Sequence, residues 1–391
     1  MDTAARHELR VLAAANPALP LLLTIGRFAR PIRRIPRLGW VVSDPVTARL
    51  ILNDATHFTL LGEGGVGHLW AQVLGDWVYD VFDGPGHHAL RTQTRELFTE
   101  DNAAALVRRV IGPRLAAAGS QLAGGGTVDV ADLARVMVGR IVADLLGLRV
   151  ASDDDAAYRE VFSTGEELAA LALGTTTSTV LEPATVARAK QIVARMTSNV
   201  AQVWRTAPAD TLLGRCRELG VEMRHTEGLA TLLMVAGTET AASAMARTVA
   251  LLHDTGAQDR LRAEPQRLPD AVREGLRVST PAPLIGRSVR ADTDVAGRRL
   301  RAGDRVMILT WTANTAPGGF SLDRSYLRDN RQLWFGAGRH LCLGAPVARA
   351  EIGALLSTLL DTGRPYRIVA RRYRRRVLIP SYEMLRVSLA S

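Results

Sequence analysis

Residues 334–344 read WFGAGRHLCLG and place one cysteine, Cys342, in a short segment with glycines before and after it. The pattern that follows, over residues 345–360, predicts a helix. Glycine reaches positive φ and carries no Cβ, so these glycines allow the backbone to curl closely around a bound group. We expect the start of the following helix to lower the pKa of Cys342 and hold it as a thiolate, the form that binds metals.

The residues alone leave four interpretations of Cys342 open. A free buried cysteine is the commonest case, and a catalytic nucleophile lacks a partner motif here. A zinc site is disfavoured, because the only other cysteine, Cys216, has no C-x-x-C neighbour. An axial thiolate ligand to haem iron accounts for the glycines, His340 and the following helix together.

The segment resembles the cysteine-ligand loop of the cytochrome P450 family, F-G-x-G-x-H-x-C-x-G, at every fixed position. The resemblance implies a mainly α fold with small β-sheets (α+β). It also implies haem b, iron protoporphyrin IX, between a long central helix and this loop, with Cys342 as the iron ligand. Four further segments match family motifs in the family's order, so we expect residues 1–391 to form a single domain.

A turn at residues 83–86 opens a predicted helix that carries His87 and Arg91 four residues apart on one face. Taken alone, the pair is either part of a solvent-exposed basic face or an anion-binding site. The segment is similar to the family's D-P-P-x-H-x-x-x-R, which implies that His87 and Arg91 bind a haem propionate. The same resemblance implies propionate contacts for Arg287 and His340.

The longest helical pattern covers residues 222–254 and contains AGTET at residues 236–240. Glu239 and Arg247 would each cost about 2.5–3.5 kcal/mol at a bilayer centre, so we expect a helix through a soluble core and no transmembrane segment. The run resembles the family's A-G-x-(D/E)-T. The resemblance implies that Thr240 hydrogen-bonds the oxygen being activated and that Glu239 feeds protons through water.

Glu274 and Arg277 lie three residues apart, where an isolated ion pair on a helix is worth about 0.2–0.5 kcal/mol. The pair looks like the family's E-x-x-R, which implies a structural role in holding the cysteine loop beneath the haem. The arginine that completes this network is either Arg324 or Arg328.

Local patterns predict the remaining elements. Residues 39–42 and 289–306 predict short strands, and residues 128–217 predict helices with a break at 175–178. Residues 60–77 are rich in glycine and predict a surface loop, or a lid, with exposed apolar side chains. Residues 380–389 predict a hairpin whose tip at 382–384 reaches toward the pocket.

The composition excludes several classes of protein. Two distant cysteines exclude a disulfide framework and suit a reducing cytoplasm, and no nucleic-acid motif accompanies the net charge of +10. That charge comes almost wholly from arginine, with Lys190 as the only lysine. A basic surface favours an acidic protein partner.

Together the residues and the resemblance predict a cytoplasmic, monomeric, bacterial-type haem-thiolate monooxygenase. It would insert one oxygen atom from O2 into a C–H bond of a largely hydrophobic small molecule, in secondary, lipid, steroid or terpene metabolism. We expect electrons to come from a separate ferredoxin and ferredoxin reductase, because 391 residues leave no room for a reductase domain. The predicted substrate-binding residues are Leu232, Val235, Ala236, Pro283, Leu284 and Met384.

Two other classes stay open. A haem-thiolate peroxygenase or isomerase would not need the acid and alcohol of Glu239 and Thr240, and a haem-binding sensor or carrier would show no turnover. The presence of this pair favours the monooxygenase.

Overall fold

Helices form most of the protein, and the computed structural model describes residues 2–29, 31–173 and 179–390. The predicted break at 175–178 lies outside the described residues. The α-helices are α1 (Thr3–Ala15), α2 (Leu19–Ile25), α3 (Pro45–Asn53), α4 (Val66–Leu74), α5 (Trp77–Asp83), α6 (Pro85–Gln93), α7 (Glu100–Ala123), α8 (Val130–Leu146), α9 (Asp155–Leu173), α10 (Pro183–Met196), α11 (Val200–Trp204), α12 (Leu212–Glu218), α13 (Met223–Gly237), α14 (Glu239–Asp254), α15 (Ala257–Ala263), α16 (Leu268–Ser279), α17 (Thr310–Thr315) and α18 (Ala345–Asp361). The 3-10 helices are η1 (Gly26–Ala29), η2 (Arg95–Phe98), η3 (Pro265–Arg267), η4 (Leu333–Phe335) and η5 (Gly338–His340).

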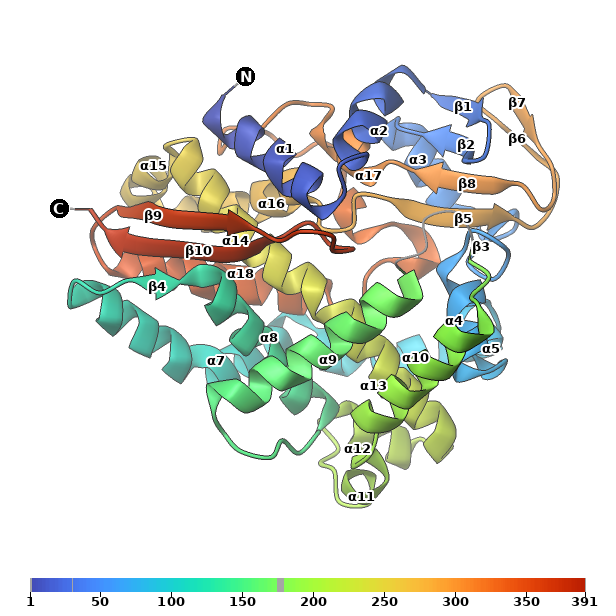
Figure 1. Ribbon diagram of the computed structural model, residues 1–391, viewed down its shortest axis with the longest axis horizontal. Coiled ribbons are helices and arrows are strands. Elements are labelled where there is room, and N and C mark those ends of the chain that lie inside the picture. Colours follow the sequence, from blue (N-terminus) through green and yellow to red (C-terminus); the bar gives the residue numbers. More distant parts are fainter. Residues whose placement is uncertain (1, 30, 174–178, 391) are drawn as a thin grey trace.

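The strands form three small sheets, so the predicted class, mainly α with small β-sheets, is confirmed. They are β1 (Ile32–Ile35), β2 (Gly39–Val42), β3 (Phe58–Thr59), β4 (Val128–Asp129), β5 (Ile285–Val289), β6 (Thr293–Val295), β7 (Arg298–Leu300), β8 (Arg305–Ile308), β9 (Tyr366–Tyr373) and β10 (Tyr382–Leu389). The sheet orders are β1-β2-β8-β5-β3, β4-β10-β9 and β6-β7. In the first sheet only β2 and β8 pair in parallel. Figure 1 shows this sheet beside the N-terminal helices and away from the body formed by α7 to α13.

The central helix crosses the middle of the molecule, but it is not continuous (Figure 1). Helix α13 ends at Gly237 and α14 begins at Glu239, and Thr238 between them has φ −83° and ψ −76°. The Thr240 hydroxyl donates to the Ala236 carbonyl oxygen at 2.8 Å, so a side chain replaces part of the regular ladder. The predicted long central helix is thus present over Met223–Asp254, with a local interruption at Thr238.

The segment Met223–Asp254 is long and apolar enough to span a membrane, but 72% of its apolar window is buried inside the protein. Arg247, which argued against a membrane span, is completely buried and pairs with Glu8 of α1. A buried guanidinium requires such a partner. The helix therefore serves as the core of this fold and ties the N-terminal helix to it.

Two local predictions are corrected. Residues 60–77 contain α4 rather than a loop alone, and Trp70 and Trp77 are buried because they pack into the main hydrophobic core. The C-terminal hairpin is formed by β9 and β10, so its turn lies at 374–381. Residues 382–384, predicted as the tip, belong to a paired strand.

Candidate functional site

The cysteine loop owes its shape to two glycines. Gly336 and Gly338 have φ of +77° and +67°, which L side chains rarely adopt. A Cβ on Gly338 would lie 2.4 Å from the Leu52 carbonyl oxygen, so the loop packs directly against the end of α3. The Cys342 N–H donates to the Phe335 carbonyl oxygen at 3.0 Å and closes the loop ahead of α18.

Cys342 keeps accessible surface although its sulfur lies deep among protein atoms. Burial raises the pKa of this thiol, and it outweighs the opposing hydrogen bonds from Gly344 and Ala345 and the charge of Arg91. The helix start thus lowers the pKa of Cys342 as expected, but the expected net result, a thiolate held by the protein alone, is wrong. The protein alone favours the thiol, and a bound metal cation is what would hold it as a thiolate.

Helix α6 lies against the cysteine loop through its basic side chains. Arg91 donates to the Leu341 carbonyl oxygen. The rings of His87 and His340 meet edge to face at 4.8 Å, and Arg339 lies 3.4 Å from His87 Nδ1. Burial, followed by the charges of His340, Arg339 and Arg91, lowers the pKa of His87 to about 4, so this imidazole is neutral at pH 7.

Asp83, at the end of α5, is the carboxylate of this basic cluster. His340 Nε2 lies 3.0 Å from Asp83 Oδ1, and the Leu60 N–H and Arg290 each donate to Oδ2 at 3.2 Å. Burial opposes its ionisation, but hydrogen bonds from His340 and Thr59 lower the pKa of Asp83 to about 2. Sequence analysis assigned Asp83 only to a turn, although it occupies the first position of the D-P-P-x-H pattern.

Arg287 is the least compensated charge of the site. It lies on β5, inside the sheet, and is only 6% exposed. Its one hydrogen bond goes to the Gly286 carbonyl oxygen at 2.8 Å, and within the described ranges it has no ion pair. Burial lowers the pKa of Arg287 to about 10. An uncompensated buried charge is costly, so this guanidinium suits an anionic ligand.

The donors near Cys342 therefore fit a haem group. An accessible sulfur can take the iron, and within the described part of the chain two imidazoles and four guanidiniums surround a single carboxylate, Asp83. Anions bind to such sets through charge-assisted hydrogen bonds. The two propionates of a bound haem would supply the negative charge that this cluster lacks.

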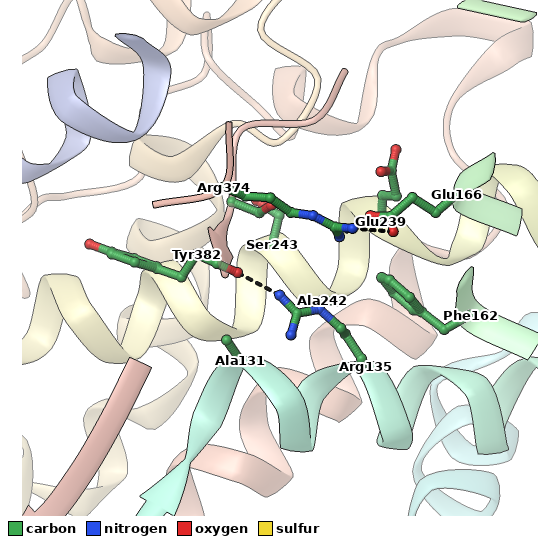
Figure 2. A pocket seen from close by; sticks show the side chains of 10 residues that line it. Ala131, Arg135, Phe162, Glu166, Glu239, Ala242, Ser243, Arg374 and Tyr382 are labelled. Carbon is green, nitrogen blue, oxygen red and sulfur yellow. Dashed lines mark hydrogen bonds and ion pairs between the residues drawn. The ribbon is translucent and has the colours of Figure 1, made fainter. Parts of the chain in front are cut away.

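The acid and the alcohol of AGTET lie at the interruption between α13 and α14. Glu239 is buried and contacts Glu166 of α9, which in turn pairs with Arg374 beyond β9 (Figure 2). Burial, then the hydrogen bond and charge of Glu166, raises the pKa of Glu239 to about 8. Thr240 keeps accessible surface beside it. Sequence analysis missed Glu166 and Arg374, because neither lies in a motif or near Glu239 in the chain.

Glu274 and Arg277 form a fully buried network. Both carboxylate oxygens of Glu274 accept from Arg277 at 2.7 Å, and Arg324 Nε donates to the same carboxylate at 3.2 Å. Arg277 also donates to the carbonyl oxygens of Asn314, Gly318 and Gly319 at 2.7–3.0 Å. Arg324 rather than Arg328 thus completes the network.

The predicted substrate-binding residues fall into separate packing groups. Val235 is buried in the largest hydrophobic cluster, Leu232 packs against that cluster, and Ala236 is exposed near the interruption. Leu284 packs against a different cluster that contains Leu309 and Trp311. Pro283 is buried ahead of β5, and Met384 is partly buried on β10 opposite Arg372. Within the described residues, no single hydrophobic cluster contains all six of these positions.

The helical fold and the groups around Cys342 fit those of a haem-thiolate protein. A family model described as Cytochrome P450 matches residues 189–362, which include Glu239, Arg287 and Cys342. Cytochrome P450-SU2 of Streptomyces griseolus is 35% identical over 187 residues, 46% of each chain. The 20-oxo-5-O-mycaminosyltylactone 23-monooxygenase of Streptomyces fradiae is 37% identical over 140 residues, 34% of this chain and 32% of the relative. The chain thus matches between a third and a half of the length of these curated relatives.

The whole fold matches solved structures as well. The structure of P450BioI in complex with an acyl carrier protein ligated to hexadec-9Z-enoic acid superimposes with a TM-score of 0.77. The match covers 96% of this chain and 99% of that chain, at 24% identity, and it establishes the fold. The chain is thus similar to cytochrome P450 proteins in sequence over residues 189–362 and in fold over nearly its whole length.

Proposed function

We propose that this protein is a haem-thiolate monooxygenase that inserts one oxygen atom from O2 into a C–H bond of a largely hydrophobic small molecule. The observation that carries the proposal is the accessible sulfur of Cys342 beside a buried, incompletely compensated set of cations. A sensor or carrier would need the same cofactor site. It would not need the buried acid and the neighbouring hydroxyl of Glu239 and Thr240.

The similarity to cytochrome P450 proteins supports haem b as the cofactor. Cys342 would hold the iron, and His87, Arg91, Arg287 and His340 would hold the propionates. When bound, a thiolate-ligated haem supplies the activation of O2, because the thiolate pushes electron density that favours O–O cleavage. The protein contributes the orientation of these groups: Arg91 bonds the backbone of the cysteine loop itself, so its guanidinium and the sulfur move together.

Proton delivery would use Glu239 and Thr240. Glu239 is protonated at pH 7 because the pKa of this carboxyl is raised to about 8. It can therefore donate a proton where an ordinary surface glutamate would already be ionised. The Thr240 hydroxyl donates to the Ala236 carbonyl oxygen, and its own oxygen stays free to accept a proton from the acid side.

The substrate is expected to be largely hydrophobic, such as a terpene, steroid, fatty acid, polyketide or aromatic metabolite. Leu232, Val235 and Ala236 on α13, with Pro283, Leu284 and Met384, are proposed to bind it. None of these six side chains is charged. An apolar site of this kind recognises shape and apolar surface.

The electrons are proposed to come from a separate ferredoxin and its reductase, in the cytoplasm, with residues 1–391 acting as a single monomeric domain. A negatively charged ferredoxin would suit the net charge of +10. Of the arginines near the cysteine loop, Arg95 is exposed and Arg349 pairs with Glu100. Arg95 is thus the better docking candidate.

An absorption spectrum of the reduced protein with carbon monoxide tests the cofactor and its ligand. Wild type and Cys216→Ala are expected to give the spectrum of a thiolate-ligated haem, and Cys342→Ala is expected to lose it. Cys216 is the matched control because it is the other cysteine and is buried away from the loop. A thiolate-type spectrum in Cys342→Ala would overturn the assignment.

Substrate screening then tests the activity. Compounds that change the spin state of the iron should be oxidised when reductant, ferredoxin and reductase are supplied. Thr240→Ala should consume reductant with less product, because proton delivery is impaired. Unchanged coupling in that variant would favour the peroxygenase or isomerase.

A further inference from the structure

The start of α14 carries a pair of carboxyl groups from two different helices. Glu239 of α14 and Glu166 of α9 line the same small pocket, together with Arg374 (Figure 2). Two carboxylates that share a buried site repel each other, so one of the two groups keeps its proton. We propose that Glu166 and Glu239 share one proton, that Arg374 keeps Glu166 as the ionised partner, and that Glu166 thereby controls when Glu239 releases the proton toward Thr240. The use of that proton in turnover rests on the proposed function.

Arg374 decides which carboxyl group is ionised. It lies in the turn between β9 and β10, and its two terminal nitrogens donate to the two oxygens of Glu166 (Figure 2). A bidentate guanidinium pair strongly favours the charged form of a carboxylate. The proton of the pair therefore belongs to Glu239.

The other groups around the pocket do not compete for this proton. Arg135 of α8 lines the same pocket but donates to the carbonyl oxygens of Tyr382 and Glu383, at 2.8 and 3.0 Å. Burial raises the pKa of Tyr382, which keeps that phenol neutral. The same burial, together with Glu166, raises the pKa of Glu239 to about 8, while Arg374 acts in the opposite direction.

The pocket connects the buried acid with the surface. The exposed fraction falls from 28% for the Arg374 side chain to 13% for the Glu166 side chain, and Glu239 is 6% exposed. The pocket volume is about 10 Å3, near the minimum that one water molecule needs. A proton can therefore reach Glu239 from solvent over a short polar route.

Gly165 is the reason that Glu166 comes so close. A Cβ on Gly165 would lie 3.1 Å from Thr238 Oγ1 and 3.3 Å from the Met234 carbonyl oxygen. Without that atom, α9 packs directly on the interruption between α13 and α14. The carboxyl group of the next residue then reaches Glu239.

Infrared titration of the purified haem-bound protein tests the proposal without measuring activity. The C=O band of protonated Glu239 is identified by its loss in Glu239→Gln, and in wild type it should disappear with a midpoint near pH 8. Glu166→Gln should lower that midpoint by about one pH unit or more, because the shared anion is removed and Arg374 is freed. Arg374→Gln should raise it, because a nearby positive charge is lost.

Glu167→Gln is the matched control. Glu167 follows Glu166 in the chain but pairs with Arg195 and Arg188 on the outside of α9, so the Glu239 midpoint should not change. An unchanged midpoint in Glu166→Gln, or a shift in the same direction in Glu166→Gln and Arg374→Gln, would overturn the proposal. A structural role alone would not give opposite shifts.

Measuring substrate oxidation as well distinguishes a failure of this proposal from a failure of the proposed function. If the midpoints shift as expected in a protein that oxidises no compound, the proton pair stands and the monooxygenase assignment fails. If substrates are oxidised and the midpoints do not shift, only the proton pair fails. In an active enzyme, Glu166→Gln should move the pH range of efficient coupling downward.

Discussion

Two buried charge clusters of this protein contrast in how completely they are paired. In the network of Glu274, Arg277 and Arg324, all five N–H donors of Arg277 find acceptors, and both oxygens of Glu274 accept hydrogen bonds. In the cluster near Cys342, Arg287 has one backbone hydrogen bond, and a single carboxylate, Asp83, faces several cations. The first cluster is complete without a ligand, whereas the second gains stability from an anion.

The degree of charge pairing thus distinguishes a structural network from a ligand-binding site. Burying charge is tolerable when the geometry satisfies each donor and acceptor, and costly when it does not. A protein keeps the costly arrangement where a ligand compensates it. The four predictions below test this contrast.

Glu274→Ala is expected to have the largest effect. It leaves Arg277 buried without its counterion, which should reduce the free energy of unfolding by about 3–5 kcal/mol. Denaturant unfolding of the haem-free protein measures this. Arg299→Ala, which removes exposed ion pairs of the β6–β7 hairpin, should change little. Similar losses in both variants would contradict the scaffold role.

Arg287→Gln should affect ligand binding instead of folding. Loss of a charge-assisted hydrogen bond, about 1.5–3 kcal/mol, should weaken haem binding roughly 10- to 100-fold. The haem-free protein should be as stable as wild type or more stable, because an uncompensated charge is gone. Haem titration and unfolding of the haem-free form measure the two quantities. If Arg287→Gln destabilised the haem-free protein and left haem affinity normal, Arg287 would belong to the structural scaffold and not to the binding site. Arg298→Gln, at an exposed position, serves as the control.

Gly336→Ala tests the loop that links the two clusters. Gly336 combines φ +77° with ψ −158°, so alanine should cost about 1–2 kcal/mol of stability. Gly344→Ala is the matched control, because Gly344 has φ −77° and its nearest contact for a Cβ is Cys342 Sγ at 3.9 Å. Equal effects on thermal unfolding would argue against backbone strain as the reason for Gly336.

Asp83→Asn should give the smallest effect, and this effect should disappear in acid. The pKa of Asp83 is lowered to about 2 in the folded protein, below its ordinary value of about 4. Its stabilisation is therefore present above pH 4 and is lost as the pH falls through 2. Allowing for solvent screening, the contribution is about 1 kcal/mol. Unfolding curves of wild type and Asp83→Asn should converge over this range, and parallel pH dependences would refute the prediction.

The sequence was sufficient for the resemblance to a family, for the mainly α class and for the residues of each local motif. Cys342, His87, Arg91 and the AGTET run are short-range patterns, whose spacing is visible along the chain. Helix starts are equally local: Asp44 caps α3 and Pro45 occupies its first turn. Local patterns did not predict the helix within residues 60–77. Burial of Trp70 and Trp77 stabilises helical structure there, although the glycines of the segment disfavour it.

Only the tertiary structure decided which charges meet. The choice of Arg324, the position of Asp83, and the contact of Glu166 and Arg374 with Glu239 all join residues distant in the chain. The pKa of Cys342 was misjudged for the same reason. A local helix start favours the thiolate, but burial by the whole fold outweighs it, because desolvation depends on every atom around the sulfur.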